Sequence, residues 1–201
     1  MTADRGGPVG NVYDKYGTKN PVSRLLVKRF RARIDTLILS TSPGSLLDVG
    51  CGEGVVTDEL AALLPSARVT GIDVPDPTLA AEWARRNAEY VAGTAYELPF
   101  DDGEFDLVSA IEVFEHLERP AAALSEMARV ARRYVLVSVP REPLWRAANV
   151  AAGRYLRELG NTPGHIQHFS RRGIATLVGT TADVTQVSGP LPWTVVLAKV
   201  R

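Results

Sequence analysis

The sequence lacks the features of secreted and membrane-spanning proteins. Its 201 residues include a single cysteine, Cys51, so no internal disulfide can form and nothing indicates an oxidising compartment. The first ten residues contain no apolar segment of a signal peptide, and no run approaches the roughly 18 apolar residues of a spanning helix. We therefore expect a cytoplasmic protein without a membrane anchor.

The sequence also lacks an excess of charge of either sign. Lys and Arg together number 23, and so do Asp and Glu, so the chain has no overall field that attracts a nucleic acid or an anionic membrane. A nucleic-acid substrate is therefore disfavoured, although a balanced net charge does not exclude a local basic groove. The length and the apolar fraction of 45% are typical of one globular domain, either monomeric or homodimeric.

What the chain does have is a regular alternation of two apolar patterns. Short apolar runs alternate with stretches in which apolar residues recur every three or four positions. These patterns predict strands at 45–50, 68–74, 90–95, 105–111 and 134–140, and helices from Pro21, at 55–64, 77–88 and 120–131, and near Ser170. The alternation indicates parallel βαβ units with helices on both faces of one sheet.

The end of the chain departs from this alternation. Residues 182–188 and 193–200 both have a strand-like pattern, and only Gly189 to Pro192 separates them. A crossover helix needs more residues than that, so these two strands must pair antiparallel.

The strongest local pattern is Asp48-Val49-Gly50-Cys51-Gly52-Glu53-Gly54, which follows the first strand and opens a helix. Glycines there let a ligand approach the backbone, and the helix start offers free N–H groups. A dinucleotide usually takes G-x-G-x-x-G, but here the third glycine comes one residue early and Asp48 would repel a pyrophosphate. A carboxylate suits the ammonium group of S-adenosylmethionine (AdoMet), and Asp73 ends the second strand, where acidic residues bind ribose hydroxyls. The remaining alternative is a tight turn without a ligand.

These residues resemble the motifs of the class I AdoMet-dependent methyltransferases. Residues 47–54 are similar to the first motif, 71–73 to the second, 93–100 to the third and 105–108 to the fourth strand. The resemblance implies an α/β Rossmann-like sheet of seven strands in the order 3-2-1-4-5-7-6, with strand 7 antiparallel. It also implies that AdoMet lies across the carboxyl ends of strands 1, 2 and 4.

The same resemblance assigns the cofactor contacts. It places Asp48, Gly50 and Gly52 at the methionine part of AdoMet, with Cys51 as a further cofactor contact. It places Asp73 at the ribose, Val74, Thr94, Ala95 and Tyr96 around the adenine, and Ile111 and Glu112 beside the methyl group. One residue departs from the family pattern. The third motif usually reads Gly-Asp-Ala, and its aspartate accepts a hydrogen bond from the adenine amino group. This chain has Thr94 at that position, and a hydroxyl group is a weaker acceptor than a carboxylate.

Glu112, Glu115 and His116 follow the fourth strand, where the acceptor is expected. Their spacing brings them together on a helical turn, and two carboxylates with an imidazole suit a divalent metal such as Mg²⁺ or Mn²⁺. His165, or His168, is a further candidate ligand. The pattern resembles the metal-assisted O-methyltransferases of the ubiquinone pathway and of small-RNA ends, in which the metal lowers the pKa of the acceptor hydroxyl. The alternatives are a metal-free site in which His116 and Glu112 act catalytically, and a structural role.

Two segments are expected to select the acceptor. Residues 1–19 are predicted to be a mobile arm in which Tyr13 or Tyr16 closes over the cofactor. Residues 141–169 are predicted to lie on the acceptor side, with Trp145, Leu144 and Tyr155 as an apolar wall.

The sequence therefore predicts methyl transfer from AdoMet to a small molecule, with a hydroxyl oxygen as the favoured acceptor atom. Methylation of nitrogen or carbon without a metal is the alternative reaction. A non-catalytic AdoMet-binding protein is a third reading, and a dinucleotide dehydrogenase is the least favoured.

Overall fold

The computed structural model describes residues 20–201, so the predicted arm with Tyr13 and Tyr16 lies outside the described residues. Seven strands form one sheet in the order β3-β2-β1-β4-β5-β7-β6. This confirms the predicted order. The strands are β1 (Ser45–Val49), β2 (Arg68–Asp73), β3 (Glu89–Ala92), β4 (Phe105–Ile111), β5 (Ala131–Pro140), β6 (Ala182–Ser188) and β7 (Trp193–Val200).

Strands β1 to β5 pair in parallel, and β7 runs antiparallel to both β5 and β6. The sheet therefore ends in the antiparallel hairpin that the short connection between β6 and β7 requires. Because β1 is flanked by β2 and β4, the chain order reverses beside β1. Ligands of open parallel sheets bind at such a reversal, outside the carboxyl ends of the strands.

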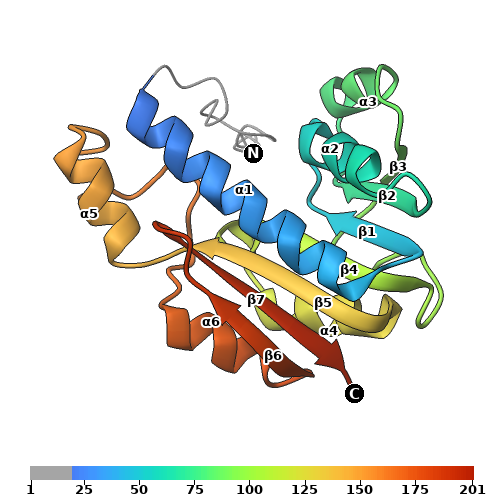
Figure 1. Cartoon of the computed structure of the whole chain (residues 1–201). Coiled ribbons are helices and arrows are strands. Elements are labelled where there is room, and N and C mark those ends of the chain that lie inside the picture. Colours follow the sequence, from blue (N-terminus) through green and yellow to red (C-terminus); the bar gives the residue numbers. More distant parts are fainter. Residues whose placement is uncertain (1–19) are drawn as a thin grey trace, which may run out of the picture.

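Helices cover both faces of the sheet (Figure 1). Side chains of neighbouring residues in a strand point to opposite faces, so Leu46 and Leu47 belong to two different clusters. Leu46 packs with α1 (Pro21–Thr41) and α2 (Val55–Leu63). Leu47 packs on the other face, with α4 (Pro120–Val130) and α6 (Arg171–Val178).

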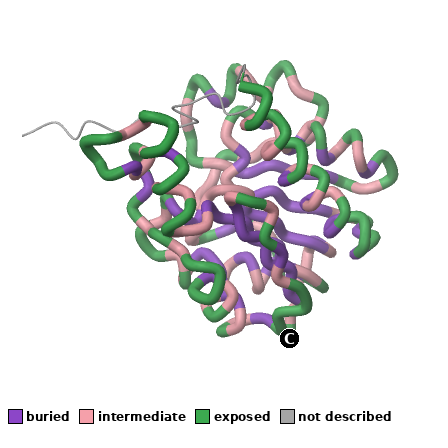
Figure 2. The backbone as a smooth tube through the Cα atoms, turned by 60° about the vertical axis from the view of Figure 1, so that its left-hand side comes forward, coloured by how far each residue is buried: buried purple, intermediate pink, exposed green. Residues whose placement is uncertain are grey.

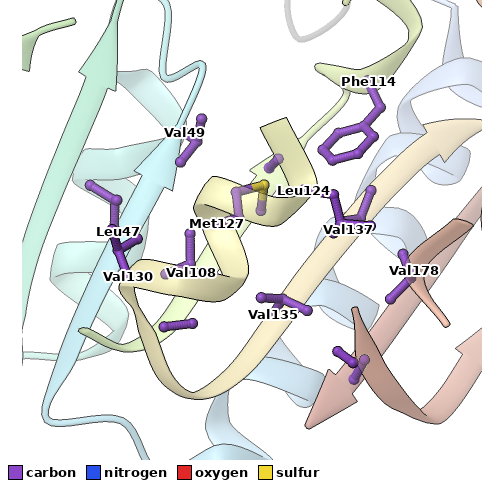
Figure 3. Packing of buried hydrophobic residues seen from close by; sticks show 14 of the residues in the cluster. Leu47, Val49, Val108, Phe114, Leu124, Met127, Val130, Val135, Val137 and Val178 are labelled. Atoms are coloured by element: carbon purple, nitrogen blue, oxygen red, sulfur yellow. The ribbon is translucent and has the colours of Figure 1, made fainter. Parts of the chain in front are cut away.

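The second of these clusters shows why the strands read as continuous apolar runs. Leu124, Met127 and Val130 of α4 lie against Leu47 and Val108 of the sheet (Figure 3). The sheet is buried between its helical layers, whereas the outer sides of the helices are exposed (Figure 2). Strands that are covered on both faces need apolar residues at successive positions, which removes the alternation of an exposed sheet.

Some element boundaries differ from the predicted ones. Helix α3 (Pro77–Trp83) stops five residues early, and β3 ends at Ala92 because Thr94 turns back to form a bridge with Glu97. Strand β5 begins at Ala131, directly after α4. Helix α5 (Leu144–Ala151), within the predicted acceptor segment, was not among the predicted helices. Within residues 20–201, every helix is too short or too polar to cross a membrane.

Candidate functional site

The glycine loop between β1 and α2 has one open position. Gly50, Gly52 and Gly54 all have positive φ angles, of 75°, 53° and 80°. A Cβ atom on Gly50 would lie 2.5 Å from Val113 Cγ2, and one on Gly54 would lie 2.6 Å from Tyr90 Oη. A Cβ atom on Gly52 would meet nothing within 4 Å. The first and third glycines therefore allow close packing of protein on protein, whereas the backbone at Gly52 is open to a ligand.

The Asp73 side chain, at the end of β2, is hydrogen-bonded to the backbone of this loop. Its Oδ2 accepts a hydrogen bond of 2.6 Å from the Gly52 amide, and its Oδ1 accepts one of 2.7 Å from the Val74 amide. Burial raises the pKa of the Asp73 carboxyl, and the two amides act in the opposite direction. Trp83 Nε1 donates to the Gly52 carbonyl at 2.8 Å, so both polar backbone groups of Gly52 are hydrogen-bonded. Val74 beside it is 41% exposed, which leaves an apolar surface open next to the carboxylate.

Asp48 lies beneath the loop and is only 2% exposed. Thr57 Oγ1 donates to its Oδ2 at 2.8 Å, and Ser109 Oγ donates to its Oδ1 at 2.9 Å. Burial raises the pKa of Asp48 to about 6, against the effect of the two hydroxyl groups. This carboxylate connects β1, α2 and β4 under the loop, and its predicted contact with the methionine ammonium stays a prediction. Cys51 is buried, and its Sγ lies 2.9 Å from the position that a Cβ atom on Gly71 would occupy.

The residues of the third motif, Thr94, Ala95 and Tyr96, form the turn that follows β3. Thr94 Oγ1 accepts a hydrogen bond of 3.3 Å from the Tyr96 amide, and Ala95 packs against the core. Tyr96 Oη accepts from the amides of Glu118 and Arg119, and the Arg119 guanidinium lies 4.5 Å from the ring centre. Tyr96 therefore ties the turn after β3 to the segment that leads into α4.

A cluster of three possible metal ligands lies just after β4. One ligand atom each of Glu115, His116 and His165 lies within 4.8 Å of the others. The first two belong to the short helix η1 (Phe114–His116), and the amides of Ile166 and Gln167 bind the Glu115 carbonyl, which brings His165 alongside. Glu115 is 1% exposed and His165 is 5% exposed, so the cluster reaches the surface through His116.

A hydrogen bond to the backbone orients the His116 ring. Its Nδ1 lies 2.9 Å from the Gly164 carbonyl, and the two histidine rings meet edge to face at 4.9 Å. A carbonyl oxygen can only accept, so Nδ1 carries the proton and the lone pair of the neutral ring is on Nε2.

Glu112 does not join this cluster. It takes a positive φ of 59° directly after β4, and its Oε1 accepts a 2.7 Å hydrogen bond from Trp193 Nε1. His168 also lies outside the cluster, with its Nε2 bonded to Asn161 Oδ1 at 2.9 Å. Of the four predicted metal ligands, the structure therefore brings three together.

A row of aromatic rings runs from this cluster to α1. The Trp145 ring lies 6.3 Å from the His165 ring and 5.5 Å from the Trp193 ring, and Trp193 stacks on Phe30 at 4.5 Å. The sequence predicted Trp145 as part of an apolar wall on the acceptor side. It gave no signal for Trp193, or for Trp83 at the loop, because both act through contacts with residues far away in the chain.

Two hollows flank α5. A cavity of about 150 Å³ separates α5 from the start of α1 and has Trp145, Tyr155 and Trp193 in its lining. An open cleft of about 550 Å³ lies on the other face of α5, beside Glu142, Arg146 and Leu159. Residues of the segment 141–169 line both hollows, and Leu144, expected in the apolar wall, lines neither. The acceptor-side role of this segment stays a prediction.

Comparisons with known proteins agree with this geometry. Residues 47–137 match a family model described as a methyltransferase domain. A demethylmenaquinone methyltransferase of Roseiflexus sp. (strain RS-1) is 36% identical over 143 residues, which cover 67% of this chain and 60% of that protein. The protein of the same name from Beutenbergia cavernae is 32% identical over 164 residues, which cover 77% of this chain and 65% of the relative. The chain thus spans about three fifths of the first relative's length.

Solved structures share the fold. The crystal structure of magnesium protoporphyrin IX methyltransferase from Synechocystis PCC 6803 with bound S-adenosylhomocysteine (SAH) superposes with a TM-score of 0.69 at 18% identity, over 92% of this chain and 90% of that one. With the strand order, the glycine loop and the matched family model, these findings show that the chain belongs to the class I S-adenosylmethionine-dependent methyltransferases.

Proposed function

We propose that this protein transfers a methyl group from AdoMet to a small organic acceptor. The observation that carries the proposal is the open backbone at Gly52, held beside the Asp73 carboxylate at the carboxyl ends of β1 and β2. The cluster of Glu115, His116 and His165 follows β4, the next strand of the sheet. A cofactor on the first site would thus have a proton-accepting group near its reacting end.

The arrangement supports a definite orientation for AdoMet. Each carboxylate oxygen of Asp73 has a second lone pair, which suits the two hydroxyl groups of a ribose. The exposed apolar surface of Val74 beside it suits the adenine ring. The methionine part would then follow the open backbone of the glycine loop toward Ile111, the last residue of β4.

His116 is the proposed general base. Methyl transfer from a sulfonium requires alignment and, for a hydroxylated acceptor, removal of a proton. The Gly164 carbonyl orients the ring and leaves the lone pair of the neutral imidazole on Nε2. Removal of a phenolic proton makes both the oxygen and the neighbouring ring carbons nucleophilic, so one base serves either acceptor atom. The name shared by several relatives, demethylmenaquinone methyltransferase, favours carbon over the oxygen expected from sequence.

The test uses AdoMet with a trideuterated methyl group and a panel of hydroxylated aromatic acceptors that includes reduced demethylmenaquinone. Mass spectrometry should find a product that carries the label, and fragmentation should locate it on carbon or oxygen. His116→Gln should keep SAH binding and lose most turnover. SAH binding without turnover on any member of a broad metabolite library would support a non-catalytic AdoMet-binding protein instead.

A metal-assisted reaction is the second candidate, favoured by the three ligand atoms that lie within 4.8 Å. The cluster offers one carboxylate and two imidazoles, a set that suits Mn²⁺ better than Mg²⁺, which prefers oxygen ligands. The bond from His116 Nδ1 to a carbonyl is the kind of outer contact that orients metal-binding histidines. When bound, the ion would lower the pKa of the acceptor hydroxyl.

A further inference from the structure

The cavity between α1 and α5 is lined by apolar and aromatic side chains together with several polar residues, among them Thr162 and Asn149. We propose that it binds an aromatic ring of the acceptor through a hydroxyl group on that ring, an inference that rests on the proposed function. Its volume of about 150 Å³ is similar to that of an apolar protein cavity that admits benzene. The space therefore suits one aromatic ring rather than a flexible polar chain.

The walls of the cavity suit a flat apolar group. Trp145 and Trp193 stand with their ring centres 5.5 Å apart and their planes inclined at 57°. Leu26 and Val27 of α1 line the same space. An aromatic ring can pack edge to face or offset against either indole, which adds to the gain from burying its apolar surface.

Two of the polar residues that line the cavity, Thr162 and Asn149, are hydrogen-bonded to each other. Thr162 Oγ1 accepts hydrogen bonds from Trp145 Nε1 at 2.9 Å and from Asn149 Nδ2 at 3.3 Å. Both lone pairs of this hydroxyl are then used, so its proton points elsewhere, and it meets no acceptor among residues 20–201.

Asn149 provides the complementary group. Its side-chain nitrogen donates to the Gly160 carbonyl at 2.9 Å as well as to Thr162, which fixes the amide with Oδ1 as a remaining acceptor. Asn149 is 9% exposed, and no donor in the described part of the chain reaches this oxygen. One unused donor and one unused acceptor therefore border the same small cavity.

A phenolic hydroxyl satisfies both groups at once. Its oxygen accepts from the Thr162 hydroxyl, and its proton is donated to Asn149 Oδ1. A ring carbonyl can satisfy only Thr162, and a methyl group can satisfy neither. A site whose buried polar groups are left unpaired by the wrong ligand discriminates strongly, so the cavity should select hydroxylated rings.

The cavity is also placed to present the acceptor to the proposed base. Trp145, which lines it, lies 6.3 Å from the His165 ring, and the His165 ring lies 4.9 Å from that of His116. A ring anchored at Thr162 would keep the rest of a larger acceptor next to this cluster.

Nuclear magnetic resonance offers a direct test because the chain has three tryptophans. Trp145 and Trp193 line the cavity, whereas Trp83 donates its indole N–H to the glycine loop. SAH should move the Trp83 indole signal, which tests the proposed function by itself. With SAH saturating, p-cresol should move the Trp145 and Trp193 signals and leave that of Trp83 in place.

The hydroxyl preference is measured by comparing p-cresol with p-xylene, in which a methyl group replaces the hydroxyl. The wild-type protein should bind p-cresol about 5- to 10-fold more tightly. Thr162→Val should weaken this preference, because only Asn149 Oδ1 is left to pair with the hydroxyl group, while Thr162→Ser and the surface control Thr180→Val should keep it. Equal affinity of the wild type for both compounds, absence of binding, or a response confined to Trp83 would overturn the proposal even where SAH binds. If Thr162→Val does not fold, the wild-type and Thr162→Ser ratios still decide.

Discussion

Trp193 Nε1 donates to Glu112 Oε1 at 2.7 Å, so the first residue of β7 holds the carboxylate that directly follows β4. This bond separates two glutamates that their spacing suggested would act together. Glu115 remains with His116 and His165, and Glu112 is directed to a tryptophan instead.

The separation gives a matched pair of variants for the metal. Glu115→Gln should weaken Mn²⁺ binding by at least about tenfold, because it removes the only carboxylate of the cluster. Glu112→Gln should leave Mn²⁺ affinity within about twofold, because its amide oxygen can still accept from Trp193. Electron paramagnetic resonance of free Mn²⁺ measures both. Equal losses would place Glu112 in the metal site, and full turnover of metal-free protein in EDTA would leave His116 as a base without a metal.

The three glycines of the loop should respond differently to alanine. At Gly52 a Cβ meets no protein atom within 4 Å, so Gly52→Ala should cost only about 1–2 kcal/mol of folding stability for the left-handed backbone. The same variant should lose SAH binding because the methyl group fills the ligand's side of the loop. Gly54→Ala should unfold at a lower denaturant concentration than Gly52→Ala, since its Cβ also meets Tyr90. Unchanged SAH affinity in Gly52→Ala would contradict the proposed cofactor position.

Asp48 should make folding stability depend on pH. Burial raises its pKa to about 6, above the usual value near 3.8, so the folded chain holds this proton more tightly than the unfolded chain does. Its contribution to stability is therefore complete below about pH 4 and is lost as the pH rises through 6, a change of about 3 kcal/mol.

Asp48→Asn removes this titration. The variant should gain stability relative to the wild type as the pH rises from 4 to 7, with denaturant unfolding at each pH as the measurement. A constant difference between the two proteins over this range would mean that the Asp48 pKa is not raised.

The sequence predicts well what depends on local pattern. The parallel strands follow from the alternation of strands and helices, and the antiparallel end follows from the short connection before β7. The glycine loop is visible as a contiguous motif, and the strand order came from the resemblance to the class I methyltransferases. The predicted boundaries of elements were wrong where a turn ends an element early. One example is β3, which ends before the bridge between Thr94 and Glu97.

The site was predictable only in part, for a physical reason. Spacing brings Glu115 and His116 onto one short turn, but the position of Glu112 depends on Trp193, 81 residues further along the chain. Likewise, the burial of Asp48 under Thr57 and Ser109, and the pairing of Thr162 with Trp145, arise from packing between distant segments. Such contacts leave no periodic trace in a single sequence.

The glycine loop and Asp73 are proposed to bind AdoMet, and calorimetric titration with SAH measures this binding. The wild type should bind one SAH per chain. Asp73→Ala should weaken binding by about 1–3 kcal/mol, or roughly 5- to 150-fold in Kd, because the ribose hydroxyls lose their acceptor. Asp183→Ala, which removes an exposed carboxylate paired with Arg201, serves as the control and should bind like the wild type. Absence of SAH binding by the wild type, or an unchanged Kd in Asp73→Ala, would rule out this cofactor site.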